Sequence, residues 1–241
     1  MLKYRERHTM KLELFSYRYA QEILQHPNYI EAYNELIEIC SNCPLPIYEG
    51  KSTNQARLDV VQQIINTYFK IVFDNNGWEG EPLVTPDNLN DSLRGDFRKN
   101  FSQVNPTTGE IKDITIQIEV EMGNIASSYR NYFKFQLSYA HKLADVAILI
   151  LPSDNLSRRI DSGVASYEKT VREIPSADLS ITVPILVIGL FDDNVIENNV
   201  KDMEENLNIV KGARTIDKEN HEALVETLIS TVLIQNENNH V

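Results

Sequence analysis

The feature that most constrains the fold is an alternating segment followed by two almost wholly apolar runs. Apolar and polar residues alternate from Ile114 to Met122, which is typical of a strand buried on one face. The runs at 145–151 and 183–191 predict strands buried on both faces. Helical patterns at 124–143 and 164–174 separate these strands. A strand, a helix and a parallel strand form a crossover unit, so we predict an α/β fold with a central mixed β-sheet flanked by helices on both faces.

The rest of the chain is assigned to the same domain, residues 1–241. Helical patterns around 9–26, 29–41 and 52–73 predict a helical N-terminal layer at about 9–73. A core at about 75–195 follows, and the turn cluster at 105–109 predicts a hairpin whose first arm is Asp96–Val104. The segment 196–241 is polar and acidic, with one helix expected near 218–233.

Composition limits the classes of function. Lys and Arg number 23 against 35 Asp and Glu, a net charge of −12, which argues against a nucleic-acid binder with a positive surface everywhere. No apolar stretch reaches the roughly 18 residues needed to cross a bilayer, and the charged N-terminus has no signal core, so we expect a cytoplasmic protein without a membrane partner. Cys40 and Cys43 are expected to be ordinary reduced thiols.

Two carboxylates on the alternating strand are the first candidate for chemistry. Glu119 and Glu121 project from the same polar face, about 7 Å apart, and repel each other. A divalent cation such as Mg²⁺ would remove the repulsion, and the hairpin would bring Asp96 alongside as a further ligand. Two alternatives stay open: the glutamates are the solvent-facing half of an edge strand, or they form a glycosidase pair.

The sequence around these carboxylates resembles type II restriction endonucleases of the BamHI/BglII group, members of the PD-(D/E)XK nuclease superfamily. The segment 119–130 is similar to their strand-to-helix junction, E-x-E-x-G-N-I-x-S-x-x-R. Residues 96–101 resemble D-x-x-K-x-F, and 78–81 resemble W-x-x-E. The resemblance covers about 75–195, a nuclease core, with further similarity at 52–55 and 183–190.

The resemblance implies a restriction-endonuclease-like fold and a role for each carboxylate. Asp96 and Glu119 would hold Mg²⁺, and Glu81 would complete the metal and catalytic site. Glu121, at a position where the superfamily usually has lysine, would act as general base or as ligand to a second metal. Glu110 or Asp113, which lie nearer the turn, are alternatives to Asp96.

A segregation of charge indicates how an acidic chain could hold DNA. No acidic residue lies between Glu121 and Asp145, so the helix that follows the strand is predicted to enter the major groove. A solvated amphipathic helix is the alternative. The segment 157–163 is a second polar and basic patch, expected between two elements. The residues predicted to contact DNA are Asn124, Ser127, Ser128, Arg130, Lys134, Arg158, Arg159, Asp161 and Ser162.

The functional hypothesis is a type II site-specific deoxyribonuclease that uses Mg²⁺ and cuts both strands of a short palindrome as a homodimer on double-stranded DNA. BamHI and BglII share a central GATC in their sites, and Asn124 and Arg130 match the inner readers, so a GATC-centred target is expected. Where BamHI has an adjacent Asp-Arg pair, this chain has Ser162-Gly163. The neighbouring Asp161-Ser162 resembles the Asn-Ser pair of BglII, so the outer pair is expected to be adenine, either purine or unread. Alternatives are a structure-selective repair or junction nuclease of the same superfamily, and a non-catalytic DNA-binding protein.

Overall fold

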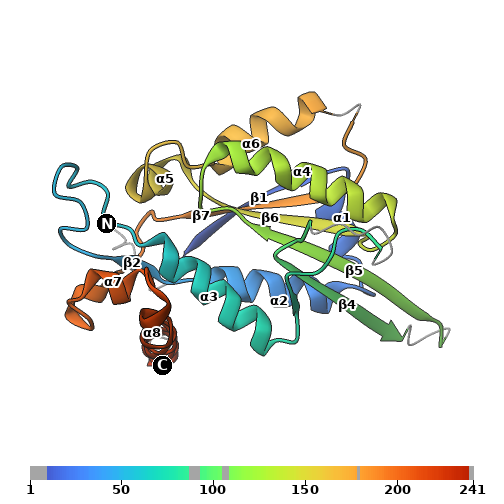
Figure 1. The fold of residues 1–241 in the computed structure, drawn as a ribbon. Coiled ribbons are helices and arrows are strands. Elements are labelled where there is room, and N and C mark those ends of the chain that lie inside the picture. Colours follow the sequence, from blue (N-terminus) through green and yellow to red (C-terminus); the bar gives the residue numbers. More distant parts are fainter. Residues whose placement is uncertain (1–9, 87–92, 105–108, 178–179, 239–241) are drawn as a thin grey trace, which may run out of the picture.

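A six-stranded mixed sheet forms the centre of the computed structural model, which describes residues 10–86, 93–104, 109–177 and 180–238 (Figure 1). The strand order is β1-β7-β6-β5-β4-β3. The three central strands are mutually parallel, whereas β1, β4 and β3 run antiparallel to their neighbours. The predicted mixed sheet is therefore confirmed. The strands are β1 (Lys11–Tyr17), β3 (Glu79–Gly80), β4 (Phe97–Val104), β5 (Ile111–Val120), β6 (Val146–Pro152) and β7 (Ile185–Phe191).

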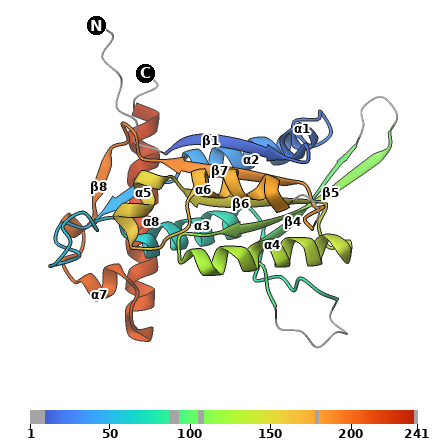
Figure 2. The same ribbon diagram turned by 90° about the horizontal axis from the view of Figure 1, so that it is seen from above.

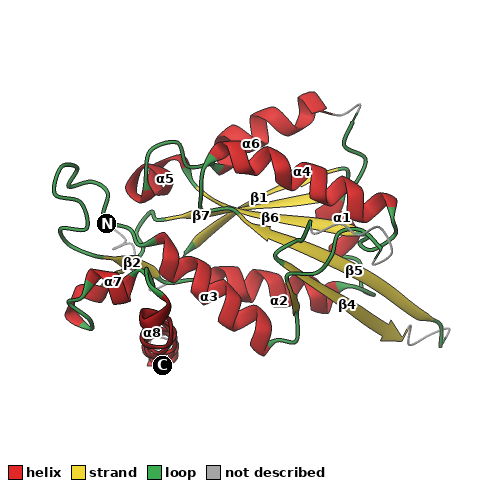
Figure 3. Cartoon of the chain, in the orientation of Figure 1, coloured by secondary structure: helices red, strands yellow, loops and turns green. Residues whose placement is uncertain are grey.

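Helices cover both faces of the sheet, as predicted (Figure 3). On one face lie α4 (Ile125–Ala140), α5 (Asp154–Ile160) and α6 (Tyr167–Glu173). On the other lie α2 (Ile30–Ser41) and α3 (Gln62–Asn75), and the short α1 (Ala20–Leu24) follows β1. The long α8 (Lys218–Asn238) packs against α3 and against α7 (Leu207–Val210) near one end of the sheet (Figure 2). No helix among the described residues is both long and apolar enough to span a membrane.

The central strands supply two separate cores because their side chains alternate between the faces. Ile116, Ile148 and Ile188 belong to the larger core, which also contains the buried residues of α2 and α3. Leu149 and Val187 belong to a smaller core under α4 and α6. On that smaller side, β5 contributes polar side chains instead of apolar ones, which positions the candidate site under α4.

Three parts of the N-terminal half differ from the sequence prediction. The predicted helix at 9–26 is wrong for its first part: residues 11–17 form β1, because hydrogen bonding to β7 at the sheet edge outweighs local helical spacing, and only Ala20–Leu24 are helical. The helix predicted at 52–73 begins only at Gln62, and turn-forming residues precede it. A small parallel sheet of β2 (Leu45–Ile47) and β8 (Glu197–Asn199) was not predicted. Of the predicted hairpin turn, residues 105–108 lie outside the described residues.

Cys40 and Cys43 lie in the larger core with their thiols free, as predicted. Burial raises the pKa of both thiols well above the ordinary value for cysteine. Neither thiol is a nucleophile or metal ligand in this environment, so the site must be sought elsewhere.

Candidate active site

The β4–β5 hairpin brings Asp96 beside the end of β5, where Glu119 and Glu121 lie, as the sequence predicted. The backbone N–H of Val120 donates to Asp96 Oδ2 over 2.8 Å. The alternatives lie at the other end of the hairpin: Asp113 is opposite Ser102, six residues or about 20 Å along the strand from Glu119. The register therefore selects Asp96, and not Glu110 or Asp113, as the neighbour of Glu119.

Glu119 is buried, with 1% of its surface exposed, so it is not the solvent-facing half of an edge strand. Burial, together with the nearby charge of Asp96, raises the pKa of its carboxyl to about 8. Gln117 Nε2 donates to Glu119 Oε1 over 3.4 Å, and Lys134 Nζ donates to Glu119 Oε2 over 2.5 Å. The carboxyl group of Glu119 is therefore buried, with the ammonium of Lys134 beside it.

Lys134 lies inside this cluster, which differs from its predicted place on the DNA-facing surface. It stands on the same face of α4 as Asn131 and Ser138, both of which are buried against the sheet. Above the polar part of β5 the inward face of α4 is polar, whereas Phe135 of the same helix packs into the smaller core. Its ammonium favours the ionised forms of Asp96, Glu119 and Glu121. Lys134 therefore balances the charge of the carboxylates in the described structure.

Glu121 follows the end of β5 and is held by one donor on each oxygen. Gly123 N donates to Oε1 over 2.9 Å, and Asn131 Nδ2 donates to Oε2 over 3.2 Å. A Cβ at position 123 would lie 3.0 Å from Glu121 Oε1, so a glycine there lets the backbone approach the carboxylate. Burial raises the pKa of Glu121, which makes its carboxylate a better proton acceptor.

A second close approach occurs before Asp96. A Cβ on Gly95 would lie 2.8 Å from Gln117 Nε2 and 3.1 Å from Glu119 Oε1. Glu81 N donates to the carbonyl of Asp96 over 2.9 Å, and Glu81 itself is exposed with a left-handed φ of 52°. The loop before β4 thus holds Glu81 close to Asp96, and the charge of Glu81 adds to the raised pKa of Asp96, which is mainly due to burial.

The donors of this cluster are the hard carboxylate oxygens that Mg²⁺ prefers. Among the described residues, however, no three Asp, Glu, His or Cys side chains converge into a ready-made set of ligands, so the expected set of Asp96, Glu119 and Glu81 is not assembled. Magnesium ions are commonly held by one or two carboxylates, with water and substrate phosphate completing the shell. The repelling pair of Asp96 and Glu119 fits that mode of binding.

An open pocket of about 350 Å³ adjoins the carboxylates. Glu81, Asp96 and Val120 line one side of it, and Asn66 and Lys70 of α3 line another. Neither α3 residue belongs to a predicted motif, because only the fold brings this helix next to the hairpin. Asp96 lines this open pocket, whereas Glu119 is not among its lining residues.

The two segments predicted to read DNA lie side by side. The N–H of Ile125 donates to the carbonyl of Gly163 over 2.9 Å, and Ala165 N donates to the carbonyl of Gly123 over 3.0 Å. Asn124 pairs with Val164 in a β-bridge and caps α4, its Oδ1 accepting from Ala126 N over 2.8 Å. The predicted readers with exposed side chains are Asn124, Arg130, Arg158, Asp161 and Ser162.

Two other predicted readers are placed differently. Ser128 is buried, and its Oγ donates to the carbonyl of Ile125 over 2.9 Å, so the hydroxyl is turned into the fold. The side chain of Ser127 lies outside what the structure describes. The patch at 157–163 is also not a loop throughout, because residues up to Ile160 belong to α5.

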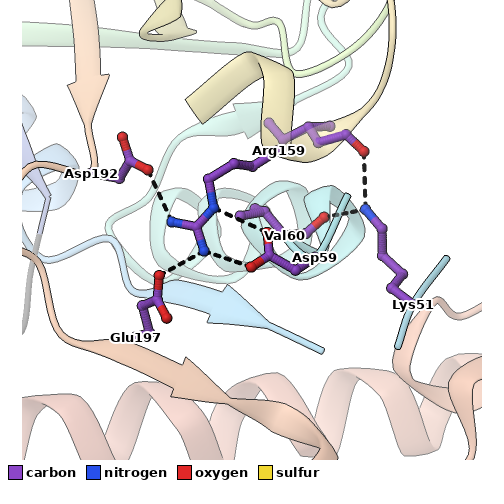
Figure 4. Close-up of polar contacts among 7 residues, drawn as sticks. Lys51, Asp59, Val60, Arg159, Asp192 and Glu197 are labelled. Atoms are coloured by element: carbon purple, nitrogen blue, oxygen red, sulfur yellow. Dashed lines mark hydrogen bonds and ion pairs between the residues drawn. The ribbon is translucent and has the colours of Figure 1, made fainter. Parts of the chain in front are cut away.

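Arg159 lies among three carboxylates (Figure 4). Its guanidinium donates to Asp59 over 2.8 and 3.0 Å, to Asp192 over 3.0 Å and to Glu197 over 2.6 Å. Lys51 Nζ donates to the carbonyl of Val60 and to the carbonyl of Ile160, the last residue of α5. Because three carboxylates already surround the guanidinium, Arg159 anchors α5 and is not a phosphate contact.

Comparison with known proteins agrees with this arrangement. The model of a family described as restriction endonuclease BglII/BglIII matches residues 12–190. The type II restriction enzyme BamHI of Bacillus amyloliquefaciens is 27% identical over 191 residues, which cover 75% of this chain and 83% of that enzyme.

One solved structure shows the same fold. Restriction endonuclease BglII complexed with a DNA 16-mer aligns with a TM-score of 0.59 at 20% identity, over 76% of this chain and 78% of that one. Free BglII aligns with a TM-score of 0.45 at 17% identity, over 78% and 81% of the two chains. The fold is thus restriction-endonuclease-like, and the chain belongs to the BglII/BglIII family of type II restriction endonucleases.

Proposed function

We propose that this chain is a Mg²⁺-dependent endonuclease that cuts both strands of double-stranded DNA at a short palindromic, GATC-centred site. The observation that carries the proposal is the meeting of Asp96, Glu119 and Glu121 beside an open pocket, next to exposed polar side chains at the start of α4. BglII was crystallised with DNA, and BamHI is named a type II restriction enzyme, which supports this substrate class.

Asp96 and Glu119 are the residues proposed to hold the metal, with Glu81 near enough to join through the pocket. A bound divalent cation would neutralise charge on the phosphate and lower the pKa of a coordinated water. Lys134 would then no longer need to balance Glu119, which frees the carboxylate oxygen that accepts from it now.

Glu121 is the proposed general base. Gly123 and Asn131 hold its two oxygens by single hydrogen bonds, which leaves lone pairs for a water molecule. Its raised pKa brings proton affinity closer to neutral pH, where a base is most effective. In this mechanism Glu121 accepts the proton of the attacking water, and the O–P bond to the leaving oxygen breaks as the new O–P bond forms.

Base reading is assigned to the exposed residues of the two bridged segments. Arg130 is suited to pair with guanine, and Asn124 Nδ2 is available as a donor because the cap uses only Oδ1. Asp161 and Ser162 are proposed to face the outer base pair, and Arg158 to contact phosphate. We expect the outer pair to be adenine, either purine or unread.

Double-strand cutting of a palindrome requires two sites related by a two-fold axis, so we propose a homodimer. An exposed aromatic surface supports this: Phe133, on the outer side of α4, is 60% exposed. Phe133→Glu is expected to give monomers in sedimentation and nicked instead of linear plasmid. Ile216→Glu, at an 80% exposed site on another element, is the matched control. A Phe133→Glu protein that stays dimeric would contradict this surface.

The decisive test is a digestion of mixed-sequence DNA with Mg²⁺ and with EDTA. We expect discrete fragments only with Mg²⁺, no cutting by Asp96→Asn or Glu119→Gln, and retained DNA binding by both, because fewer negative charges face the phosphates. Asp113→Asn, at the far end of the hairpin, is the matched control and should cut normally. Sequenced fragment ends identify the site, and ends without GATC would refute that part.

Other outcomes favour other functions. Nicks that depend on DNA structure and not on sequence would favour a repair or junction nuclease. Binding without any cleavage would favour a non-catalytic DNA-binding protein.

A further inference from the structure

The open pocket that Glu81 and Asp96 line is called here the catalytic pocket. One of its walls comes from α3, a helix that the sequence motifs do not include. Asn66 and Lys70 stand four residues apart on α3, so their side chains lie on the same face of the helix. Both are exposed, and both line the pocket that contains Asp96 and Glu81. The side chains of Asn66 and Lys70 are therefore accessible to a ligand bound in the pocket.

The charges in the pocket make Lys70 distinctive. Glu81 and Asp96 are both acidic, and Lys70 is the one basic residue among the described residues that line the pocket. A phosphate group entering the pocket meets carboxylates on one side and needs a cation on another. Lysine binds phosphate as a compact point charge with several donors.

Lys70 already has an anionic partner on α8. Its Nζ donates to Glu222 Oε1 over 2.8 Å, and both side chains are largely exposed. One residue earlier on α8, His221 Nε2 lies 2.8 Å from Thr67 Oγ1 of α3. This second contact fixes the helices against each other, so Glu222 stays within reach of Lys70. The family model ends at residue 190, so Glu222 belongs to a part of the chain that the model does not cover.

We propose that Asn66 and Lys70 hold a phosphate of the DNA backbone in the catalytic pocket, and that Glu222 competes with this phosphate for Lys70. The inference rests on the nuclease function proposed above and adds a phosphate contact outside the recognised motifs. In the free protein the ammonium of Lys70 is paired with Glu222 of α8, and in the DNA complex it binds the phosphate instead. The C-terminal helix therefore sets how tightly backbone phosphate is held.

The test measures binding of short fluorescein-labelled duplexes in EDTA, which prevents cleavage, over a series of KCl concentrations. One duplex carries the site mapped from wild-type digestion, and the other carries a scrambled sequence. For Lys70→Gln we expect the Kd to rise roughly tenfold on both duplexes, the effect of one charge-assisted hydrogen bond. The slope of log Kd against log KCl should fall by about 0.9, since one phosphate contact is lost. Lys70→Arg should keep the wild-type slope.

Glu222→Gln separates the competition from the contact. Removing the competing carboxylate should lower the Kd roughly two- to fivefold, in line with the strength of an exposed ion pair. Lys112→Gln is the matched control, because it removes a similar exposed pair, Lys112 with Glu110, at the far end of the hairpin. Its Kd and slope should equal those of the wild type. Urea unfolding checks that each variant is folded.

Each result bears on a different claim. An unchanged slope and Kd for a folded Lys70→Gln would overturn the phosphate contact while wild-type cleavage left the nuclease function intact. A reduced slope for Lys70→Gln with an unchanged Kd for Glu222→Gln would overturn the competition by α8. A wild-type protein that neither binds nor cuts any duplex would overturn the nuclease function itself.

Discussion

Replacing Lys134 with methionine tests the electrostatics of the buried cluster directly. The ammonium lies 2.5 Å from Glu119 Oε2, and the two side chains are 13% and 1% exposed. Methionine fills a similar volume but brings no charge. Because the partner carboxyl stays buried, the cost of the substitution depends on whether Glu119 is ionised.

The size of that cost follows from the pKa of Glu119. A carboxyl whose folded pKa is raised from 4.5 to about 8 contributes stability that is complete below pH 4.5 and is lost as the pH rises to about 8. Below pH 7 Glu119 is largely protonated, so Lys134→Met should cost about 1 kcal/mol, one hydrogen bond. Above pH 8 wild-type Glu119 is ionised, whereas the variant's carboxyl stays protonated. The difference should then grow by about 1.4 kcal/mol per pH unit, towards the roughly 3–5 kcal/mol typical of a broken buried pair.

Urea unfolding in EDTA at pH 6, 7, 8 and 9 measures this difference without metal. The matched control is Lys99→Met, which breaks the partly buried pair of Lys99 and Glu35 outside the carboxylate cluster. We expect its effect to be the same at every pH. A pH-independent difference for Lys134→Met as well would show that the buried environment of Glu119 does not control the pair, and the reasoning would fail.

Three further changes test other parts of the structure. Gly95→Ala should reduce cleavage at least tenfold and lower stability by about 1–3 kcal/mol, because the new Cβ displaces Gln117 or Glu119; normal activity in digestion assays would contradict this. Arg159→Met should lower the midpoint of thermal unfolding, since it leaves three carboxylates unpaired; a second variant that also carries Asp59→Asn should recover part of the loss. Asn124→Asp should keep the cap of α4, because a carboxylate oxygen can still accept from Ala126 N. It should weaken binding of the mapped duplex in fluorescence anisotropy, because the Nδ2 donor is replaced by a negatively charged oxygen. Unchanged affinity would show that Asn124 does not read the base.

Local pattern was enough to predict the central strands. The alternation of β5 and the apolar runs of β6 and β7 lie within each segment and predict the strands. The prediction that β5 is buried on one face only is wrong at Gln117 and Glu119, because α4 covers its polar face. Strand β1 could not be found in this way. Its partner β7 lies more than 160 residues away, and its short segment carries no pattern strong enough to reveal that pairing.

The site was predictable where a single segment carried it. Glu119 and Glu121 were recognised by spacing and by their motif, and Asp96 by its flanking residues. The role of Lys134 was missed because it depends on which side of α4 faces the sheet. Among the apolar residues of α4, Phe133 is 60% exposed, whereas the inward positions include the polar Asn131 and Ser138. A helix over a polar strand reverses the ordinary pattern, which only the packing reveals.

The strongly negative net charge is compatible with DNA binding because of where the acidic residues lie. Beyond Phe191 the sequence has 11 acidic against 4 basic residues, more than half of the excess of −12. By contrast, segments 51–58 and 122–144 have no acidic residue at all. At physiological salt the field of an exposed charge fades within about 8 Å, so a remote acidic segment repels DNA only weakly at the reading surface. Glu222 differs from the other acidic residues of this segment because it contacts Lys70, which lines the pocket. Its effect on the Kd for DNA should therefore be local and measurable.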